Sequence, residues 1–332
     1  MIRAIFHLIL LLAVAAALTA WDARRQLAAP MPLEGEQALT VARGTAWSRL
    51  VADLQARGWL SPRTALYLKA YGRISGDAAR IQAGEYALQP GTTPVELVAL
   101  LKSGDVISYQ LTLVEGWRTD QAWAAVRAHP KIKRSEGLDE PVALMQALGK
   151  ADQHPEGRFL PETYRFTNQT SDVEFMRRAY VAMEAAMARQ WAARQPDLPL
   201  ASADDALILA SIIERETGVP AERPQIAGVF VRRLRLGMRL QTDPTVIYGM
   251  GDAFDGNIRR RDLRTDTPYN TYTRKGLPPT PIALPGEAAL AAAVNPADGD
   301  SLFFVSRGDG SHVFSATVQE HNAAVRKYQL KR

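Results

Sequence analysis

The 332-residue sequence contains no cysteine, and this absence removes several classes of chemistry. There can be no disulfide framework, no thiolate metal site and no cysteine nucleophile. The chain has five histidines, none with the spacing of metal ligands: His7, His129, His154, His312 and His321. No G-x-S-x-G, S-x-x-K or phosphate-binding glycine loop occurs, which disfavours serine hydrolase and nucleotide chemistry. We therefore expect neither a metal nor a cofactor.

The charged residues are not gathered into long runs of one sign. The formal net charge of +5 comes from arginines spread over the whole length, and not from a basic tail or a basic stripe interleaved with aromatic residues. This pattern is typical of a solvated surface of mixed charge. Attraction to an anionic wall or membrane surface is the next alternative, and nucleic acid is not an expected partner. With 47% hydrophobic and 23% charged residues, the chain is long enough for two packed domains.

One long hydrophobic run is present, at the N-terminus. From Ala4 to Trp21 only a histidine and a threonine are polar, which gives about 27 Å of helix, close to the thickness of a bilayer core. The run fits a retained signal anchor or a cleaved signal peptide, because its alanines offer a cleavage site. We expect residues 1–22 to form a transmembrane signal anchor and residues 23–35, which include two prolines, to form an extended linker.

An internal repeat follows at a spacing of 47 residues. Six positions align: Val41, Gly44, Thr45, Leu50, Val51 and Leu54 with Leu88, Gly91, Thr92, Leu97, Val98 and Leu101. Each copy predicts a strand, a glycine turn and an amphipathic helix, and the second helix is capped by Thr93, begins at Pro94 and stops at Gly104. Chance similarity of common strand-turn-helix chemistry is the alternative. Our interpretation is a small β-α module at 36–110 that resembles LysM, a fold associated with binding of glycans that contain N-acetylglucosamine.

Beyond residue 110 the sequence predicts a larger, mixed helical domain that ends in a β-hairpin. The stretch "YQLTLVEGW" is expected to be a strand that closes the first domain. Helices are expected at 119–129, 141–148, 171–194, 202–216, 222–236 and from 317 onward. Two proline-rich, aromatic stretches, 240–251 and 267–286, are too irregular for core elements, and ordered loops of this kind usually serve a ligand. The predicted fold class is therefore α+β.

The helix expected at 202–216 is very apolar, with the run "LILASII", yet it ends in two acids. At about 100° per residue, Glu214 and Glu216 point about 200° apart, so they are not a catalytic pair. Burial and the negative end of the helix dipole both raise the pKa of a glutamate there. A carboxylic acid that stays protonated near neutral pH can protonate a leaving glycosidic oxygen. The alternative is structural: one glutamate pairs with Arg215 or Arg223 and the other faces solvent.

A second carboxylate would normally be needed, because glycosidases use two, on different elements across a groove. Composition provides four candidates: Glu115, Glu156, Glu162 and Asp243. Asp243 stands before a proline, which is also an ordinary turn. Spacing pairs none of them with Glu214, so the partner stays open at this point.

Four blocks of sequence together resemble the YceG-like (MltG) family of endolytic murein transglycosylases: "PEGRFLPETY", "LASIIERETG", "RLRLGMRLQTDPTVIYG" and "YNTYTRKGLPPTPIALPG". The resemblance covers essentially the whole chain. It implies a single-pass inner-membrane protein whose catalytic domain, 111–332, faces the periplasm and cleaves the MurNAc-GlcNAc β-1,4 bond of nascent glycan strands, which limits their length. Peptidoglycan strands would be the substrate, with peptidoglycan synthases as candidate partners. One departure is "TPIALPG", with threonine and leucine where the family often has glycine and asparagine.

The resemblance places the catalytic role on the glutamate that follows the apolar "ASI" run, Glu214. In a lytic transglycosylase the 6-hydroxyl of N-acetylmuramic acid attacks its own anomeric carbon and gives a 1,6-anhydro end, so one carboxyl group can serve as acid and then as base. Seven loop residues with amide, hydroxyl, carboxylate or aromatic groups become expected groove residues: Gln241, Thr242, Asp243, Tyr248, Asn270, Thr271 and Tyr272. Two alternatives remain, a hydrolytic muramidase that uses Glu214 with Asp243, and a membrane-anchored glycan-binding scaffold whose acids are structural.

Overall fold

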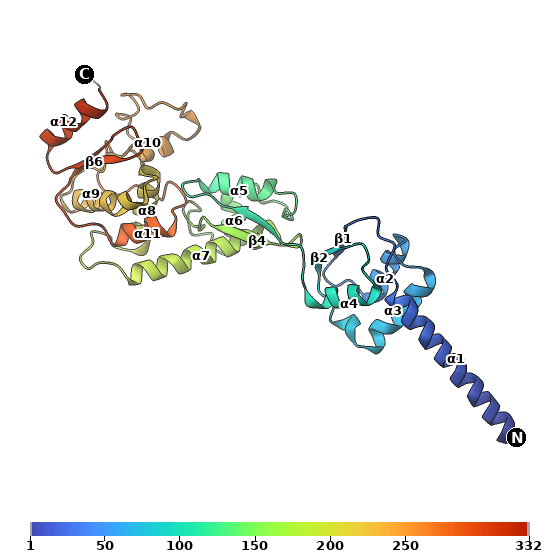
Figure 1. Cartoon of the computed structure of the whole chain (residues 1–332). Helices are drawn as coiled ribbons and strands as arrows, with labels where there is room; N and C mark the ends of the chain where they lie inside the picture. Colours follow the sequence, from blue (N-terminus) through green and yellow to red (C-terminus); the bar gives the residue numbers. More distant parts are fainter. Residues whose placement is uncertain (1, 331–332) are drawn as a thin grey trace. The chain divides into compact units, whose positions relative to one another are not determined.

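The computed structural model describes residues 2–330, which divide into two compact units (Figure 1). The first unit holds the chain up to Tyr109 together with Arg165–Thr170, and the second holds Gln110–Tyr164 and the chain from Ser171 onward. The first contains α1 (Ile2–Ala28), β1 (Gln37–Val41), α2 (Trp47–Ala56), α3 (Pro62–Ile74), the 3-10 helix η1 (Asp77–Ala79), β2 (Gly84–Leu88) and α4 (Pro94–Ser103).

The remaining elements are mostly helices. They are β3 (Tyr109–Thr112), α5 (Thr119–Ala128), α6 (Pro141–Ala147), β4 (Thr163–Phe166), α7 (Asp172–Ala192), α8 (Ala203–Glu216), η2 (Pro220–Glu222), α9 (Arg223–Arg235), α10 (Asp243–Met250), η3 (Gly251–Ala253), α11 (Glu287–Val294), β5 (Phe303–Ser306), β6 (His312–Ser315) and α12 (Val318–Tyr328). The described strands pair into two-stranded sheets. The prediction of an α+β chain with an N-terminal apolar helix and a C-terminal hairpin is confirmed.

The two copies of the internal repeat form equivalent strand-turn-helix segments. β1 and β2 pair antiparallel, with Gln37 opposite Leu88. Each strand is followed by a glycine with positive φ, Gly44 at 77° and Gly91 at 92°, which glycine adopts without strain. The aligned side chains of α2 and α4 are buried in one core: Leu50, Val51, Leu54, Leu97, Val98 and Leu101. The repeat is therefore structural, whereas the resemblance to LysM stays a prediction.

α1 extends further into the first unit than the sequence suggested. It is long and apolar enough to cross a membrane, as expected of an anchor. Residues 23–28, expected to begin an extended linker, continue the helix instead. Leu27 is 6% exposed and Met31 is 4% exposed within the core of the first unit, and the Met31 N–H donates to the Thr92 carbonyl at 2.9 Å. Because burial of these apolar side chains stabilises the docked form, the segment is packed and not free.

α8 is the central helix of the second unit. Every residue from Ala206 to Ile213 is buried, and α7, α9, α10 and α11 pack against it. Ser202 caps its start by accepting a hydrogen bond from the Asp205 N–H. The prediction that this helix is buried on most sides is confirmed, and its burial ends at the turn that carries the two glutamates.

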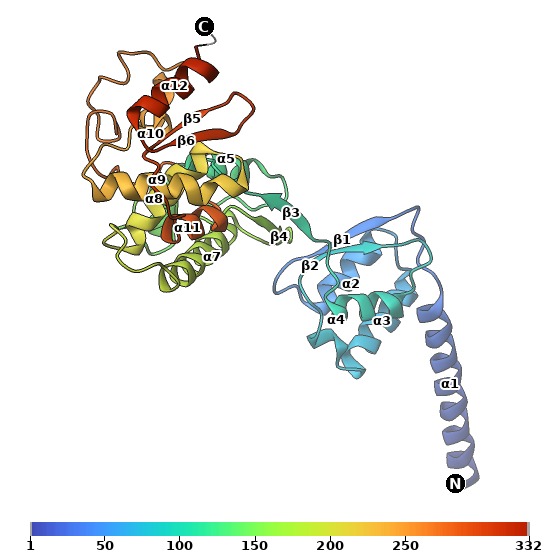
Figure 2. The ribbon, with the colours of Figure 1, turned by 60° about the vertical axis from the view of Figure 1, so that its left-hand side comes forward.

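The C-terminal hairpin is fixed to the helices around it. β5 and β6 pair antiparallel, with Val305 opposite Val313, and α12 packs against both strands (Figure 2). Phe304 of β5 meets Phe230 of α9 edge to face, with 5.8 Å between ring centroids. The hairpin is therefore held on α9, the helix that follows the two glutamates in the chain.

Two predicted elements differ from the structure. β3 pairs with β4 in a two-stranded sheet of their own and does not extend the β1–β2 sheet of the first unit. The stretch 240–251, expected to be irregular, contains α10, with a proline in the first turn where its fixed φ suits a helix. The stretch 267–286 has neither helix nor strand, as expected.

Candidate functional site

The last turn of α8 directs its two glutamates into different surroundings. The side chain of Glu214 is 4% exposed. Its Oε1 lies 3.0 Å from Nη2 of Arg223, and its Oε2 accepts a hydrogen bond of 2.9 Å from the Gly286 N–H. Both oxygens of Glu214 are therefore occupied. The pairing with Arg223 agrees with the alternative in which one of the two glutamates forms a structural ion pair with an arginine.

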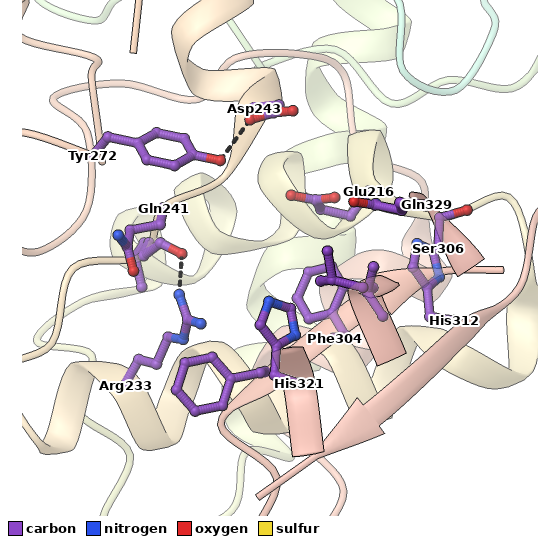
Figure 3. Close-up of a pocket in the computed structure, with 14 residues that line it drawn as sticks. Glu216, Arg233, Gln241, Asp243, Tyr272, Phe304, Ser306, His312, His321 and Gln329 are labelled. Carbon is purple, nitrogen blue, oxygen red and sulfur yellow. Dashed lines mark hydrogen bonds between the residues drawn. The ribbon is translucent and has the colours of Figure 1, made fainter. Parts of the chain in front are cut away.

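Glu216 faces a cavity of about 530 Å³ (Figure 3). Its Oε1 accepts a hydrogen bond from the Thr242 hydroxyl. Its Oε2 has no hydrogen-bond partner within residues 2–330. The cavity is also lined by Arg233, Leu240, Gln241, Asp243, Tyr272, Phe303, Phe304, Val305, Ser306, His312, His321, Val325 and Gln329. One oxygen of Glu216 is thus held in place while the other remains available to a ligand.

The surroundings of Glu216 bring the pKa of its carboxyl group close to neutral pH. Burial raises the pKa of Glu216 to about 7, well above its ordinary value. The hydrogen bond from Thr242 lowers this pKa, the negative charge of Asp243 raises it, and His312 and Arg233 lower it. A carboxyl group with such a pKa populates both protonation states at neutral pH, so it can donate a proton and take one back. The raised pKa that the sequence suggested for an acid at this helix end is found at Glu216.

Three of the seven expected groove residues line this cavity. Tyr272 donates a hydrogen bond of 2.6 Å to Asp243 (Figure 3). Burial and the bond to the carboxylate raise the pKa of Tyr272, so its hydroxyl stays a neutral donor. Gln241 has a φ of 52°, which is uncommon for a residue other than glycine. This turn leads the chain into α10 and places Asp243 on the cavity wall.

Three other expected residues lie next to the cavity and support it. Thr242 is 2% exposed and holds Glu216, as described above. Thr271 accepts a hydrogen bond of 3.1 Å from the Thr242 N–H through its hydroxyl. Asn270 is 1% exposed, and its side-chain amide donates to backbone carbonyls within 262–265. These residues stabilise the loop that carries the cavity wall and do not line the cavity.

The four candidates for a second carboxylate lie in different places. Within the described residues, Asp243 is the one of the four that lines the cavity. Glu156 is 5% exposed, and its oxygens accept hydrogen bonds from a backbone N–H and two hydroxyl groups, one of them that of Tyr248. Tyr248, an expected groove residue, is thereby a structural partner of Glu156. Glu115 lies 3.5 Å from the arginine that pairs with the first glutamate of α8. Glu162 is exposed just before β4.

The wall formed by the hairpin and α12 was not predicted. Glu222 accepts hydrogen bonds from the His312 N–H at 2.8 Å and from Nδ1 of the same ring at 2.7 Å. Although burial raises it, these bonds lower the pKa of Glu222 more, so Glu222 stays ionised and orients the imidazole. His321 of α12 stacks on Phe303 of β5, with centroids 5.2 Å apart. His312 and His321 were the available sequence signal for this wall, although their spacing fits no metal site.

Comparison with known proteins gives concordant matches. The chain matches the model of the YceG-like family over residues 39–327. An endolytic murein transglycosylase of Bacillus subtilis (strain 168) is 33% identical over 268 residues, which are 76% of this chain and 74% of that protein. One of Streptococcus pneumoniae serotype 2 is 26% identical over 273 residues, which are 72% of this chain and 49% of that protein, so the chain spans about half of its length.

A solved structure also matches across both units. A yceG-like protein from Listeria monocytogenes is 28% identical with a TM-score of 0.54, and the match covers 88% of this chain and 99% of that one. The family model spans both units and, apart from Gln329, every residue that lines the cavity. The chain belongs to the YceG-like family.

Proposed function

We propose that this chain is an endolytic murein transglycosylase whose single catalytic carboxyl group is Glu216. One observation carries this proposal: Glu216 has a pKa of about 7, one oxygen held by Thr242 and the other open to the cavity. The activity for which the Bacillus subtilis relative is named supports the class of reaction. Glu214, on which the family resemblance placed the role, has both oxygens occupied and does not line the cavity.

The proposed reaction needs one group that gives and then accepts a proton. Protonated Glu216 donates its proton to the oxygen that links N-acetylmuramic acid to the next N-acetylglucosamine, and the bond from that oxygen to the anomeric carbon breaks. The 6-hydroxyl of the same muramic acid forms a bond to the anomeric carbon, and its proton passes to the Glu216 carboxylate. The products are a 1,6-anhydro end and a free 4-hydroxyl, with no water consumed. A pKa near 7 suits both half-steps because neither form of the acid is costly.

The Asp243–Tyr272 pair is the proposed electrostatic support of this reaction. A carboxylate on the same cavity can stabilise the positive charge that develops at the anomeric carbon. The same placement favours a second candidate function, a hydrolytic muramidase in which Asp243 serves as the partner of Glu216 and the product has a reducing end. The nature of the product end separates the two.

The first unit and α1 give the proposed setting of the enzyme. We propose that α1 is a single-pass anchor in the inner membrane, with both units in the periplasm, and that the first unit is a LysM-like module that binds glycan strands. Peptidoglycan synthases are proposed protein partners, because the substrate is their nascent product.

The experiment that tests the assignment is mass spectrometry of the products formed from uncrosslinked glycan strands by the full chain in detergent. Wild type and Glu214→Gln should both give anhydro-ended products, and Glu216→Gln should give none. Products with reducing ends would show that the reaction is hydrolysis, as in the muramidase alternative, and not lytic transglycosylation. Loss of products in Glu214→Gln with retention in Glu216→Gln, both folded, would return the role to Glu214. No cleavage by folded wild type would support a non-catalytic scaffold.

A further inference from the structure

An apolar groove of about 750 Å³ lies in the first unit beside the C-terminal part of α1. α1 contributes Ala20 and Ala23, α3 contributes Tyr71 and Ile74, and α4 contributes Val95. Ile74 is 87% exposed and Val95 is 37% exposed, although both are aliphatic. No segment within residues 2–330 covers this groove, and exposed apolar surfaces of this kind usually mark an interaction site.

The groove has a fixed position on α1, because the helix is attached to the first unit by polar contacts. Gln26 accepts a hydrogen bond of 3.0 Å from Thr64, near the start of α3. One turn earlier in α1, Asp22 accepts a hydrogen bond of 2.7 Å from Tyr67. As α3 proceeds it therefore runs back along α1, so that its last residue, Ile74, lines the groove together with Ala20. The exposed end of α3 thus points toward the apolar part of α1.

The apolar part of α1 ends at the level of the groove. Its run of mostly apolar residues ends at Trp21, and about 20 apolar residues are needed to cross a bilayer core. Arg25 lies over the Trp21 ring at 5.7 Å, and such aromatic and basic residues favour the interface between lipid tails and headgroups. Arg24, one of the two charged residues that line the groove, lies in the same turn of the helix. The groove is therefore continuous with the surface of α1 that a bilayer would cover.

We propose that this groove rests on the surface of the bilayer that α1 spans, with lipid chains against Ile74 and Val95 and lipid phosphates against Arg24. The first unit is then bound to the membrane at two points, the spanning helix and the end of α3. This inference rests on the proposed membrane insertion of α1 and does not depend on which glutamate is catalytic.

The absence of cysteine allows a direct test with single labels on the full chain. Ile74→Cys, Leu10→Cys within α1 and Gln55→Cys at the exposed end of α2 are each labelled with bimane and reconstituted in vesicles of phosphatidylcholine and phosphatidylglycerol. Brominated phospholipids should quench the labels at 10 and 74 several-fold more than the label at 55. Quenching at 10 alone would overturn the groove contact and leave the anchor. No quenching at 10 would overturn both.

A second variant distinguishes contact with lipid from contact with another copy of the chain. In a Val95→Cys chain, Ile74→Asp should reduce quenching of the label, since an aspartate at the groove opposes burial in lipid, whereas Gln55→Asp should leave it unchanged. Both substitutions are at exposed positions, so the fold is expected to tolerate them. If the emission of the label at 74 shifts with the protein-to-lipid ratio and is not quenched by brominated lipid, the groove is covered by a second copy of the chain and not by the bilayer.

Discussion

The two sides of the last turn of α8 differ in what packs against them. On the Glu214 side, Arg223 and the Gly286 N–H occupy both oxygens, and the side chain is closed off. On the Glu216 side, Thr242 occupies one oxygen and a cavity meets the other. The same residue type, two positions apart, is thus an ion-pair partner in one case and the proposed proton donor in the other. The difference lies in the neighbours and not in the helix.

The largest effect expected is on the rate of cleavage. Glu216→Gln should lower kcat by about 10²- to 10⁴-fold, because a glutamine cannot donate or accept the proton. Glu214→Gln should retain activity within about tenfold at a temperature where it is folded. Initial rates on glycan strands, with folding checked by circular dichroism, make this comparison. Equal losses in both variants would mean that the two sides of the turn are not functionally distinct.

The next largest effect is on stability, and here Glu214→Gln should be the more affected of the two variants. Glu214→Gln should lower the free energy of unfolding by about 3 kcal/mol, because it leaves the buried Arg223 guanidinium without its closest carboxylate. Arg223 keeps only the more distant contact with the half-exposed Glu115. Urea unfolding of the full chain in detergent measures the loss. A Glu214→Gln chain as stable as wild type would contradict the view that Glu214 is a structural ion-pair partner.

The stability of the Glu216 side should depend on pH. Its folded pKa of about 7 lies above the ordinary unfolded value, so the folded state disfavours the ionised form. The contribution of this group is therefore fully present below the unfolded pKa and is lost as pH rises through 7. Glu216→Gln is neutral throughout, so its stability relative to wild type should rise by about 3 kcal/mol between acidic and mildly alkaline pH. A difference that does not change with pH would contradict the raised pKa.

Much of the fold could be predicted, because the signals concerned are local. The capping pairs Ser171–Glu174 and Thr317–Glu320 mark helix starts where the structure has them. The repeat predicted the core positions of α2 and α4 because helical periodicity decides which residues face inward. The partner of β3 could not be predicted, since strand pairing joins residues distant in sequence.

The candidate site could be predicted in part for the same reason. Helix geometry indicated that the two glutamates diverge, and composition indicated Asp243 and Tyr272. Which glutamate meets the cavity depends on Arg223, on the Gly286 N–H and on the C-terminal hairpin, none of which local sequence places. The expected groove residues Asn270 and Tyr248 are equally suited to sugars and to loop carbonyls or carboxylates, and the tertiary structure uses them for the latter.

The smallest effect expected is a shift of the pH–rate profile through Thr242. Its hydroxyl donates to Glu216 and lowers the pKa of that group. Thr242→Val removes the donor at nearly constant volume, so the pKa should rise and the loss of kcat/KM at alkaline pH should move upward by roughly half a pH unit. Thr242→Ser keeps the hydroxyl and should leave the profile unchanged. Thr242 contacts Glu216 and not Glu214. A shift of the profile in the valine variant alone would therefore show that Glu216 carries the proton on which the rate depends. A profile that does not shift would show that the group controlling the rate is not Glu216.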